Sequence, residues 1–484
     1  MLTNEQNAIV NAAERSARSG ARLKVLAGAG TGKTTTLFAV AERLSTLNRK
    51  VLYLAYNRAI MLESKDRFAN KADVMTLHGL AYRSMGVGKS RRLLGTIYPS
   101  VVAKALDLPE MQFGMKRFAL ARAILGTLSA FFTSGDLKIT CQHVPAYLTT
   151  KLSDDQLGWI VSHAQQFFGM AMPNRKTDLP LTHDLYLKAW HVEGTPGLER
   201  YDTVLLDEAQ DANPVIVHAL SHARHAVFVG DSNQQIYSFR GAIDAMSLLA
   251  GDEMPLTQSF RWGPEIARIA NKILANKQKP PKWPLRGDPL KESVVRRVDP
   301  GKRHARIYRT NNDLMQDALL LTYLKKSIAM VGDRKDLSLA LESAQALREG
   351  RPDDVKHYLL RQYDSWEDAV SESNAGGSSS HAQEIQQLVR LVHSYGSRLN
   401  DLIDLLNSEQ HEESADVVLT TAHRAKGREW DNVVITQDFD RVLDNSQTRD
   451  KIDLELNLLY VSVTRARQVL EIQSEVLAGY IAKR

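Results

Sequence analysis

Short apolar runs alternate with helical segments along much of the chain. The run 23–27 ends in a glycine-rich turn, and residues 34–44 then place apolar side chains at the 3.6-residue spacing of a helix. Further short apolar runs follow at 51–55, 203–206, 226–229, 416–420 and 433–435. Short strands that alternate with helices predict parallel sheets in an α/β fold. The strands form two groups, one on each side of about residue 265.

Two long stretches between these groups have helical patterns. Residues ~84–195 lack a comparable strand run and contain an amphipathic segment at 115–132, and residues ~315–408 are helical in pattern and rich in charge. The second stretch is interrupted at 371–380 by a sequence typical of a flexible Gly/Ser linker. We therefore predict two α/β cores, each with a mainly helical insertion. The segments are a first core at 1–83 and 196–264 with its insertion at 84–195, and a second core at 265–314 and 409–484 with its insertion at 315–408.

Composition narrows the protein class. Of 484 residues, 43% are hydrophobic and 24% charged, which excludes a mostly disordered or collagen-like chain. Cys141 is the only cysteine, so an intrachain disulfide and cysteine-rich metal sites are excluded. The start of the sequence lacks the features of a signal peptide, and charges interrupt every apolar run before it could span a bilayer. We expect a soluble cytoplasmic protein with no membrane partner.

The glycine-rich turn has the pattern of a phosphate-binding loop. Glycines let successive backbone N–H groups face a phosphate chain, and the helix that follows adds a favourable dipole. Lys33 would then reach the β- and γ-phosphates of a nucleotide, and the Thr34 hydroxyl would bind Mg²⁺. The alternative is a turn without a ligand, which the Gly-Lys-Thr sequence between a strand and a helix disfavours. The nucleotide-binding candidates in this loop are Ala27, Gly28, Ala29, Gly30, Thr31, Gly32, Lys33, Thr34 and Thr35.

An acidic segment, Asp207-Glu208-Ala209-Gln210-Asp211, follows the strand at 203–206. An Asp at a strand end can hold Mg²⁺, and a Glu beside it can deprotonate the attacking water. The alternative is an acidic helix N-cap. Together with the phosphate loop, the segment favours nucleotide hydrolysis over nucleotide binding alone.

With further motifs in the same order, the chain resembles the UvrD/Rep-type superfamily 1 DNA helicases, and within them the F-box-type branch. The later motifs are Gly230 to Ala242, Gln258 to Arg261, Thr421 to Trp430 and Tyr460 to Ala466. The resemblance implies two RecA-like cores with ATP and Mg²⁺ as cofactors, and 3′→5′ movement on single-stranded DNA. The implied catalytic residues are Lys33, Asp207, Glu208, Gln234, Arg261 and Arg465, with Thr34 and Asp207 on the metal.

The resemblance also implies further nucleotide contacts and a set of DNA contacts. Gln6 would read the adenine edge, Phe260 would stack on the base, and Glu429 would lie near the ribose. Arg261 and Arg465, from the second core, would reach the γ-phosphate, so that the site is complete only when the two cores close. The DNA-contact candidates are Asn57, Thr76, His78, Tyr237, Phe239 and His423.

Several alternatives stay open at the level of sequence. Phe239 could instead pack in a core, and His78 could be a satisfied buried histidine. The family usually has Thr-Phe-Thr-Asn-Lys after its second strand, whereas this chain has Ala55-Tyr56-Asn57-Arg58. Asn57 therefore matches the Asn of the family, but Tyr56 lies immediately before it and does not match the Phe. The second insertion is also shorter than in large members of the family, at about a hundred residues.

Two hypotheses about function remain. The first is an ATP-dependent DNA helicase or translocase that acts on single-stranded DNA and duplex junctions. The second is a DNA-stimulated ATPase subunit that serves a nuclease or a repair or defence partner without robust unwinding of its own. A small-molecule kinase would leave the later motifs unexplained. The net charge of +6 permits nucleic-acid binding without requiring it.

Overall fold

The computed structural model describes residues 2–88, 93–236, 245–361, 363–375, 380–444 and 446–482. The chain divides into two compact units. The first comprises residues 1–27 and 32–256, and the second comprises residues 28–31 and 257–484. Among the described residues, no helix is both long and apolar enough to span a membrane.

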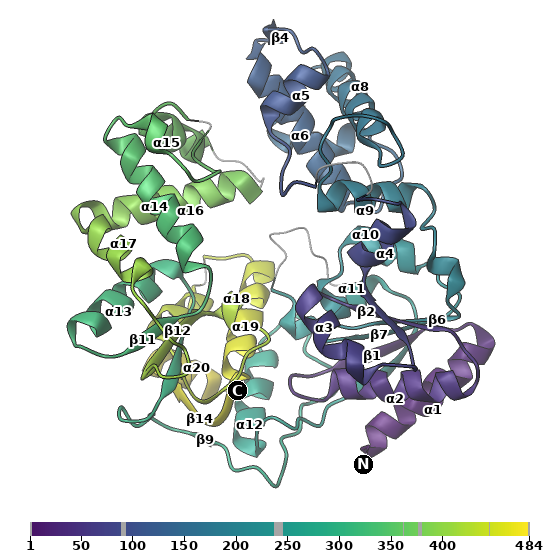
Figure 1. Ribbon diagram of the computed structural model, residues 1–484. Coiled ribbons are helices and arrows are strands. Elements are labelled where there is room, and N and C mark those ends of the chain that lie inside the picture. The colour runs from purple at the N-terminus through teal and green to yellow at the C-terminus, as the bar shows by residue number, and fades with distance from the viewer. Residues whose placement is uncertain are drawn as a thin grey trace. The chain divides into compact units, whose positions relative to one another are not determined.

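A parallel sheet forms the centre of the first unit (Figure 1). In the part of the chain that the structure describes, its order is β3-β2-β6-β7-β1-β8. All neighbouring strands are parallel, so their carboxyl ends lie at one edge of the sheet. The strands are β1 (Leu23–Ala27), β2 (Val51–Ala55), β3 (Asp73–Thr76), β6 (Thr203–Leu206), β7 (Ala226–Gly230) and β8 (Asp252–Leu256).

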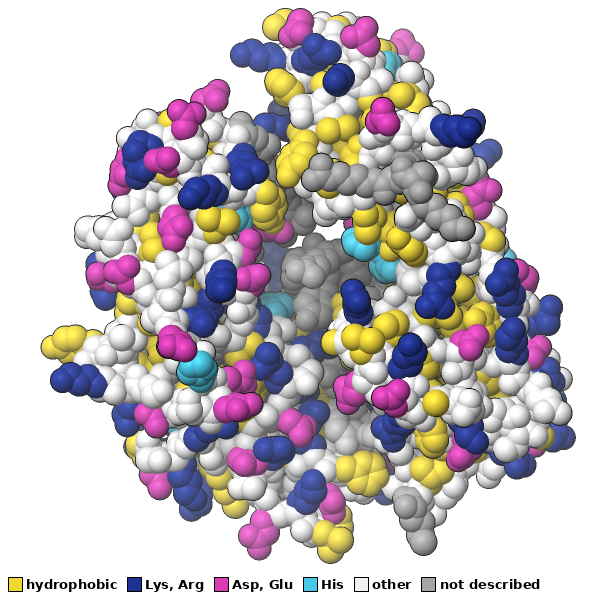
Figure 2. Space-filling model, in the orientation of Figure 1, with side chains coloured by type: hydrophobic (Ala, Val, Ile, Leu, Met, Phe, Trp, Pro, Cys, Tyr) yellow, Lys and Arg dark blue, Asp and Glu magenta, His cyan; other side chains and the backbone are white. Residues whose placement is uncertain are grey.

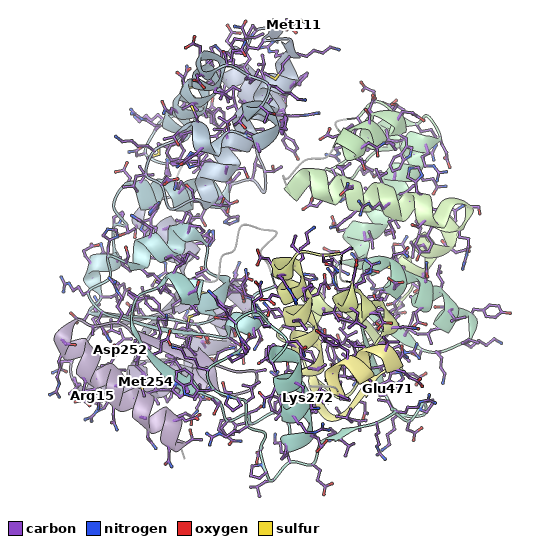
Figure 3. The ribbon with its side chains drawn as sticks, turned by 180° about the vertical axis from the view of Figure 1, so that it is seen from behind. Arg15, Met111, Asp252, Met254, Lys272 and Glu471 are labelled. Atoms are coloured by element: carbon purple, nitrogen blue, oxygen red, sulfur yellow. The ribbon has the colours of Figure 1, made fainter. Side chains whose placement is uncertain are left out.

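Both faces of this sheet are buried, which explains why its central strands are apolar without alternation. On one face, α1 (Asn4–Ser19) and α2 (Lys33–Thr46) pack on the strands through Ile9, Leu37 and Val40. Seen from behind, α1 lies against the edge strand β8, where Arg15, Asp252 and Met254 are labelled (Figure 3). The other face packs against α4 (Leu77–Ser84), α9 (His183–Val192), α10 (Pro214–Leu220) and α11 (Ala245–Leu248).

The helical insertion of the first unit follows α4. Its core continues the core beneath the sheet and contains Leu120, Ile124, Phe131 and Phe167. A two-residue antiparallel pair, β4 (Met111–Gln112) and β5 (Met115–Lys116), forms a small hairpin, and Figure 3 places Met111 at the far end of the insertion. The helices of the insertion are α5 (Pro99–Ala105), α6 (Arg117–Thr133), α7 (Ala146–Thr149) and α8 (Asp154–Ala171).

The second unit also has a parallel sheet, with the order β11-β12-β10-β13-β14-β9 among its described residues. Its strands are β9 (Val294–Val295), β10 (His304–Tyr308), β11 (Ile328–Met330), β12 (Val417–Thr421), β13 (Trp430–Ile435) and β14 (Ala466–Ile472). The helices that belong with the sheet are α12 (Pro264–Leu274), α13 (Asn311–Tyr323), α18 (Ala422–Ala425), α19 (Arg449–Val463) and α20 (Glu475–Ala482).

A second helical insertion lies between β11 and β12. Its apolar side chains, among them Leu341, Leu360 and Leu402, share one core with β12 and α13. Its helices are α14 (Arg334–Arg348), α15 (Trp366–Ala375), α16 (Ser380–Tyr395) and α17 (Leu399–Asn407).

The predicted fold class is confirmed: both units are α/β, and each sheet has a mainly helical insertion. Two details differ from the expectations. Of the predicted Gly/Ser linker at 371–380, residues 371–375 are the last five residues of α15, where Ser373 is buried. Ser380 begins α16, and residues 376–379 lie outside the described residues. β11 lies in the stretch 315–408 that was predicted to be helical. The division into six segments stays a prediction, and residues 257–264 group with the second unit.

Candidate active site

The turn after β1 has the backbone of a phosphate-binding loop. Gly30 and Gly32 have φ angles of +71° and +76°, in the left-handed region that favours glycine. Gly32 precedes the first residue of α2 and supplies no side-chain cap to that helix. The amino-terminal N–H groups of α2 therefore face the same edge of the sheet as the loop, which suits an anion.

Lys33, the first residue of α2, is buried beside carboxylates. Its Nζ lies 3.0 Å from Oε1 of Glu208, and this ion pair is largely shielded from solvent. Burial on its own would lower the pKa of Lys33, but the charges of Glu208, Asp231 and Asp207 raise it above its ordinary value. Lys33 is therefore positively charged and is held at the carboxyl edge of the sheet, as phosphate binding requires.

Asp207 follows β6 and lies close to the Thr34 hydroxyl. Thr34 Oγ1 donates to Oδ2 of Asp207 over 3.0 Å, and the hydroxyl of Tyr53 donates to the same oxygen over 2.8 Å. Burial and the charge of Glu208 raise the pKa of Asp207, whereas Lys33 and Tyr53 oppose that shift. A buried carboxylate beside a hydroxyl is an oxygen donor set that suits Mg²⁺, and a cation there would stabilise the charged form. Thr34 and Asp207 are the residues that would hold it.

Glu208 has an unusual backbone conformation. Its φ angle is +51° and its ψ angle +42°, which is left-handed and uncommon for a residue other than glycine. Such outliers concentrate at functional sites, where the surrounding structure holds them. The carboxylate contacts Lys33 through Oε1 and the amide of Gln210 through Oε2. Glu208 precedes the short 3-10 helix at Ala209–Asp211, but its side chain makes no capping hydrogen bond there, so its carboxylate does not serve as an acidic N-cap.

The segment after β7 lies beside this acidic segment. Asp231 is 1% exposed, and its Oδ2 accepts a hydrogen bond of 2.7 Å from Nε2 of Gln234. Since β7 neighbours β6, Gln234 belongs to the same edge of the sheet as Glu208. Tyr237 and Phe239, the aromatic DNA candidates of this motif, lie outside the described residues.

Gln6 is held by contacts within its own unit. Its Oε1 accepts a hydrogen bond from the N–H of Thr3 over 2.9 Å, which completes a capping box at the start of α1. Its Nε2 donates to Thr36 Oγ1 over 3.2 Å. These bonds give Gln6 a structural role, and the predicted contact with adenine stays a prediction.

A second group of predicted residues lies in the second unit. Nε of Arg261 lies 2.6 Å from Oε2 of Glu429, and Nη1 of Arg261 donates to the carbonyl of Thr464 over 3.0 Å. Burial would raise the pKa of Glu429, but Arg261, Arg467 and Arg465 lower it. The structure therefore brings Arg261 and Glu429 together. Phe260, which precedes Arg261 in the sequence, is 41% exposed, so its ring is accessible for stacking.

Arg465 is 2% exposed and bonds to its own unit. Its guanidinium donates to the carbonyl of Val461 over 2.8 Å, to the carbonyl of Arg428 over 3.2 Å and to the hydroxyl of Thr464 over 3.1 Å. These groups lie at the end of α19 and before β13, so the arginine joins two motifs of the second unit. In this structure these three bonds lie within the second unit, and a contact with phosphate stays a prediction.

The remaining DNA candidates have local structural roles. Asn57 caps α3 (Arg58–Arg67), and Thr76 caps α4, each through a hydrogen bond from a backbone N–H. Ala55 pairs with Thr76 across β2 and β3, so both caps lie at the carboxyl edge that also carries Asp207. His78 packs edge-on to His183 and Tyr186, and burial lowers its pKa. His423 belongs to α18, in the second unit.

Two residues of the site were missed by the sequence analysis. Tyr53 is the one polar side chain in the run Val51–Ala55, and a buried tyrosine hydroxyl usually needs a hydrogen-bond partner. Gln210 lies inside the acidic motif and is 0% exposed. Their polarity could have marked them, but their partners depend on which strands become neighbours.

Comparisons with known proteins show the family of this chain. Residues 7–240 match the family model of an AAA domain, and residues 353–475 match that of a UvrD-like helicase C-terminal domain. The chain is 30% identical to F-box DNA helicase protein 1 of Schizosaccharomyces pombe, over 99% of this chain and 58% of that protein. It is likewise 30% identical to F-box DNA helicase 1 of Gallus gallus, over 97% of this chain and 48% of that protein.

A more distant match has a similar extent along the chain. The ATP-dependent DNA helicase UvrD2 of Mycobacterium tuberculosis is 23% identical over 92% of this chain and 75% of that protein. The chain spans about half the length of the two F-box helicases that it matches. The matches cover both units and both sets of site residues.

Proposed function

This chain belongs to the UvrD-like DNA helicases of superfamily 1, and from that premise we propose that it is an ATP-dependent DNA helicase or translocase. It hydrolyses ATP, moves 3′→5′ along single-stranded DNA and acts at duplex junctions. The observation that supports this most lies at one edge of the first sheet. There a phosphate loop precedes Lys33, which pairs with Glu208, and Thr34, which donates to Asp207.

The residues of the first unit bind and activate ATP in this proposal. The loop amides and Lys33 hold the β- and γ-phosphates, and Glu208 accepts the proton of the attacking water. Thr34 and Asp207 would hold Mg²⁺, which would neutralise phosphate charge when bound. Gln234 senses the γ-phosphate.

The residues of the second unit respond to the same nucleotide. Arg261 and Arg465 stabilise charge on the γ-phosphate, Glu429 lies near the ribose and Phe260 stacks on adenine. Alternation of this engagement with release couples each hydrolysis event to movement of the strand. Asn57, Thr76, His78, Tyr237, Phe239 and His423 contact the DNA.

DNA-stimulated ATP hydrolysis tests the proposed chemistry. Lys33→Ala should lose hydrolysis because phosphate binding is lost, whereas Glu208→Gln should bind ATP and hydrolyse it about 100-fold more slowly. Lys302→Ala, a change at an exposed position of the second unit, is the matched control and should behave as wild type. Undiminished hydrolysis by Lys33→Ala would show that the phosphate loop is wrongly assigned.

Strand separation tests the proposed movement. Duplexes with a 3′ tail should be unwound in preference to duplexes with a 5′ tail, and the opposite preference contradicts the polarity. Hydrolysis that DNA stimulates without strand separation would favour an ATPase subunit that serves a nuclease or repair partner.

A further inference from the structure

Gln210 joins two motifs through a single buried amide. Its Nε2 donates to Oε2 of Glu208 over 2.6 Å, and its Oε1 accepts from the backbone N–H of Asp231 over 2.9 Å. Glu208 follows β6 and Asp231 follows the neighbouring strand β7. The amide therefore spans the ends of adjacent strands at the edge where hydrolysis is proposed.

The orientation of this amide is fixed by its neighbours. Nε2 also lies 3.3 Å from Oδ2 of Asp211, so the nitrogen faces two carboxylates while the oxygen faces an N–H donor. An inverted amide would place its oxygen against both carboxylates and its nitrogen against another donor. Only the observed orientation satisfies all three partners.

The backbone of β7 leaves room for this side chain at Gly230. A Cβ atom at that position would lie 2.7 Å from Oε1 of Gln210 and 3.0 Å from its backbone nitrogen. Real side chains essentially never approach so closely, so the amide occupies space that only glycine leaves open. The position of the Gln210 side chain therefore depends both on β6, which it follows, and on the glycine in β7.

The hydrogen bonds continue from Asp231 to the proposed γ-phosphate sensor. The carboxylate of Asp231 accepts from Nε2 of Gln234 over 2.7 Å and from the N–H of Asn233 over 3.0 Å. These contacts join Glu208 to Gln234 through the side chain of Gln210 and then through the backbone and the carboxylate of Asp231. Gln210, Asp231 and Gln234 are all buried, which raises the cost of breaking these bonds.

We propose that Gln210 is a positioning residue that links the proposed base, Glu208, to the proposed γ-phosphate sensor, Gln234. The inference rests on the proposed function, since it assigns a role in ATP hydrolysis. Lys33 holds Oε1 of Glu208 and must turn toward phosphate when ATP binds, whereas Gln210 holds Oε2 from within the first unit. Gln210 thus keeps the base oriented after Lys33 leaves it.

Two substitutions distinguish loss of the amide donor alone from loss of both the donor and the acceptor. Gln210→Glu keeps an acceptor for the N–H of Asp231 but removes the donor to Glu208, and Gln210→Met removes both at similar size. We expect the KM for ATP to stay within about threefold and kcat to fall about 10- to 100-fold, with the larger loss in Gln210→Glu.

A glutamine away from the proposed site provides a matched control. Gln165, in α8, donates to the carbonyl of Ile139 over 2.9 Å. Gln165→Met loses that bond and should leave both kcat and the KM for ATP unchanged.

A double variant distinguishes positioning from general destabilisation. If Gln210 acts through Glu208, then Gln210→Met should cause no further loss of kcat in a Glu208→Gln background. Full kcat in Gln210→Met, or an additive loss in the double variant, would overturn the inference. If Gln210→Met fails to fold, the isosteric Gln210→Glu decides by the same criteria. Absence of ATP hydrolysis by the wild-type chain would instead overturn the proposed function.

Discussion

Asp207 accepts hydrogen bonds from two hydroxyl groups that lie far apart from it in the sequence. Thr34 comes from α2 and Tyr53 from β2, and both reach Oδ2 of the carboxylate. The backbone N–H of Glu208 donates to the other oxygen over 2.9 Å. Asp207 is therefore fixed in place before any cation arrives, and the loss of one hydroxyl should be measurable.

Tyr53→Phe removes one of these donors and keeps the ring, which stacks on Phe68 with 4.3 Å between centroids. We expect the free energy of unfolding to fall by about 1 kcal/mol. The Mg²⁺ concentration for half-maximal ATP hydrolysis should rise several-fold, because the donor holds the carboxylate in its charged form. Denaturant unfolding and a Mg²⁺ titration of the hydrolysis rate measure the two effects.

Tyr201→Phe is a matched control for this change. Tyr201 donates to Oδ2 of Asp73 over 2.8 Å, so its variant loses the same kind of bond at β3. A similar loss of stability with an unchanged Mg²⁺ requirement is expected. An equal rise in the Mg²⁺ requirement in both variants would show that the effect of Tyr53 is indirect.

Single residues of the site could be predicted from sequence only where a motif names them. The spacing of Gly, Lys and Thr after a strand identified Lys33 and Thr34, which the structure brings to Glu208 and Asp207. The left-handed conformation of Glu208 has no sequence signature, because it is imposed by the surrounding contacts. The role of Gln210 likewise depends on the pairing of β6 with β7.

At the scale of elements, the predicted strands of the first sheet are its four central strands. The apolar runs 23–27, 51–55, 203–206 and 226–229 are all strands of the first sheet. The edge strands β3 and β8 were missed, because an edge strand has one neighbour and tolerates polar residues such as Asp73 and Glu253. β8 even contains Pro255, which is compatible with an edge but not with a sheet centre.

His225 fastens α1 to the sheet of the first unit. It is 2% exposed, with Nε2 at 2.9 Å from Ser16 Oγ and Nδ1 at 3.0 Å from Thr203 Oγ1. Burial, with a smaller effect of Arg49, lowers the pKa of His225 to about 4. The folded state therefore prefers the neutral ring, whereas the unfolded chain takes up a proton near pH 6.5.

The first unit should consequently become less stable as the pH is lowered. The stabilisation by His225 is fully present above about pH 6.5 and is lost as the pH falls from there to about 4. At pH 5 the loss amounts to about 2 kcal/mol. His225→Gln keeps polar atoms in place without a titrating group, so its melting temperature should fall less between pH 7 and pH 5. Circular dichroism melts at the two pH values measure the difference.

His411→Gln is the matched control for replacing a histidine with glutamine. His411 is exposed beside Glu409 in the second unit, and this variant should melt as wild type does. If wild type and His225→Gln lose the same stability on acidification, the buried ring does not set the acid sensitivity.

At the scale of the whole molecule, charge is dispersed. On the face that Figure 2 shows, Lys and Arg side chains are interspersed with Asp and Glu, in keeping with a net charge of +6 over 484 residues. Lys33 and Arg261 are moreover engaged by Glu208 and Glu429. Binding of single-stranded DNA should then rely on a few phosphate contacts together with stacking.

The salt dependence of DNA binding tests this expectation. About three to five neutralised phosphates would give a log–log slope of about −2 to −3.5 for single-stranded DNA. Fluorescence anisotropy of a labelled oligonucleotide between about 50 and 300 mM salt measures the slope. A value steeper than about −6 would mean that a concentrated basic groove binds the strand.

The order of strands in the first sheet has a consequence during synthesis of the chain. β1 is made early, yet Leu23 pairs with Val227 of β7 on one side and with Asp252 of β8 on the other. At about 5–20 residues per second, a ribosome needs on the order of 10 to 40 s to produce these partners. During that interval the nascent strand has both hydrogen-bonding edges open. The strand that leads into the phosphate loop therefore acquires both of its neighbours only after the chain has been translated past residue 256.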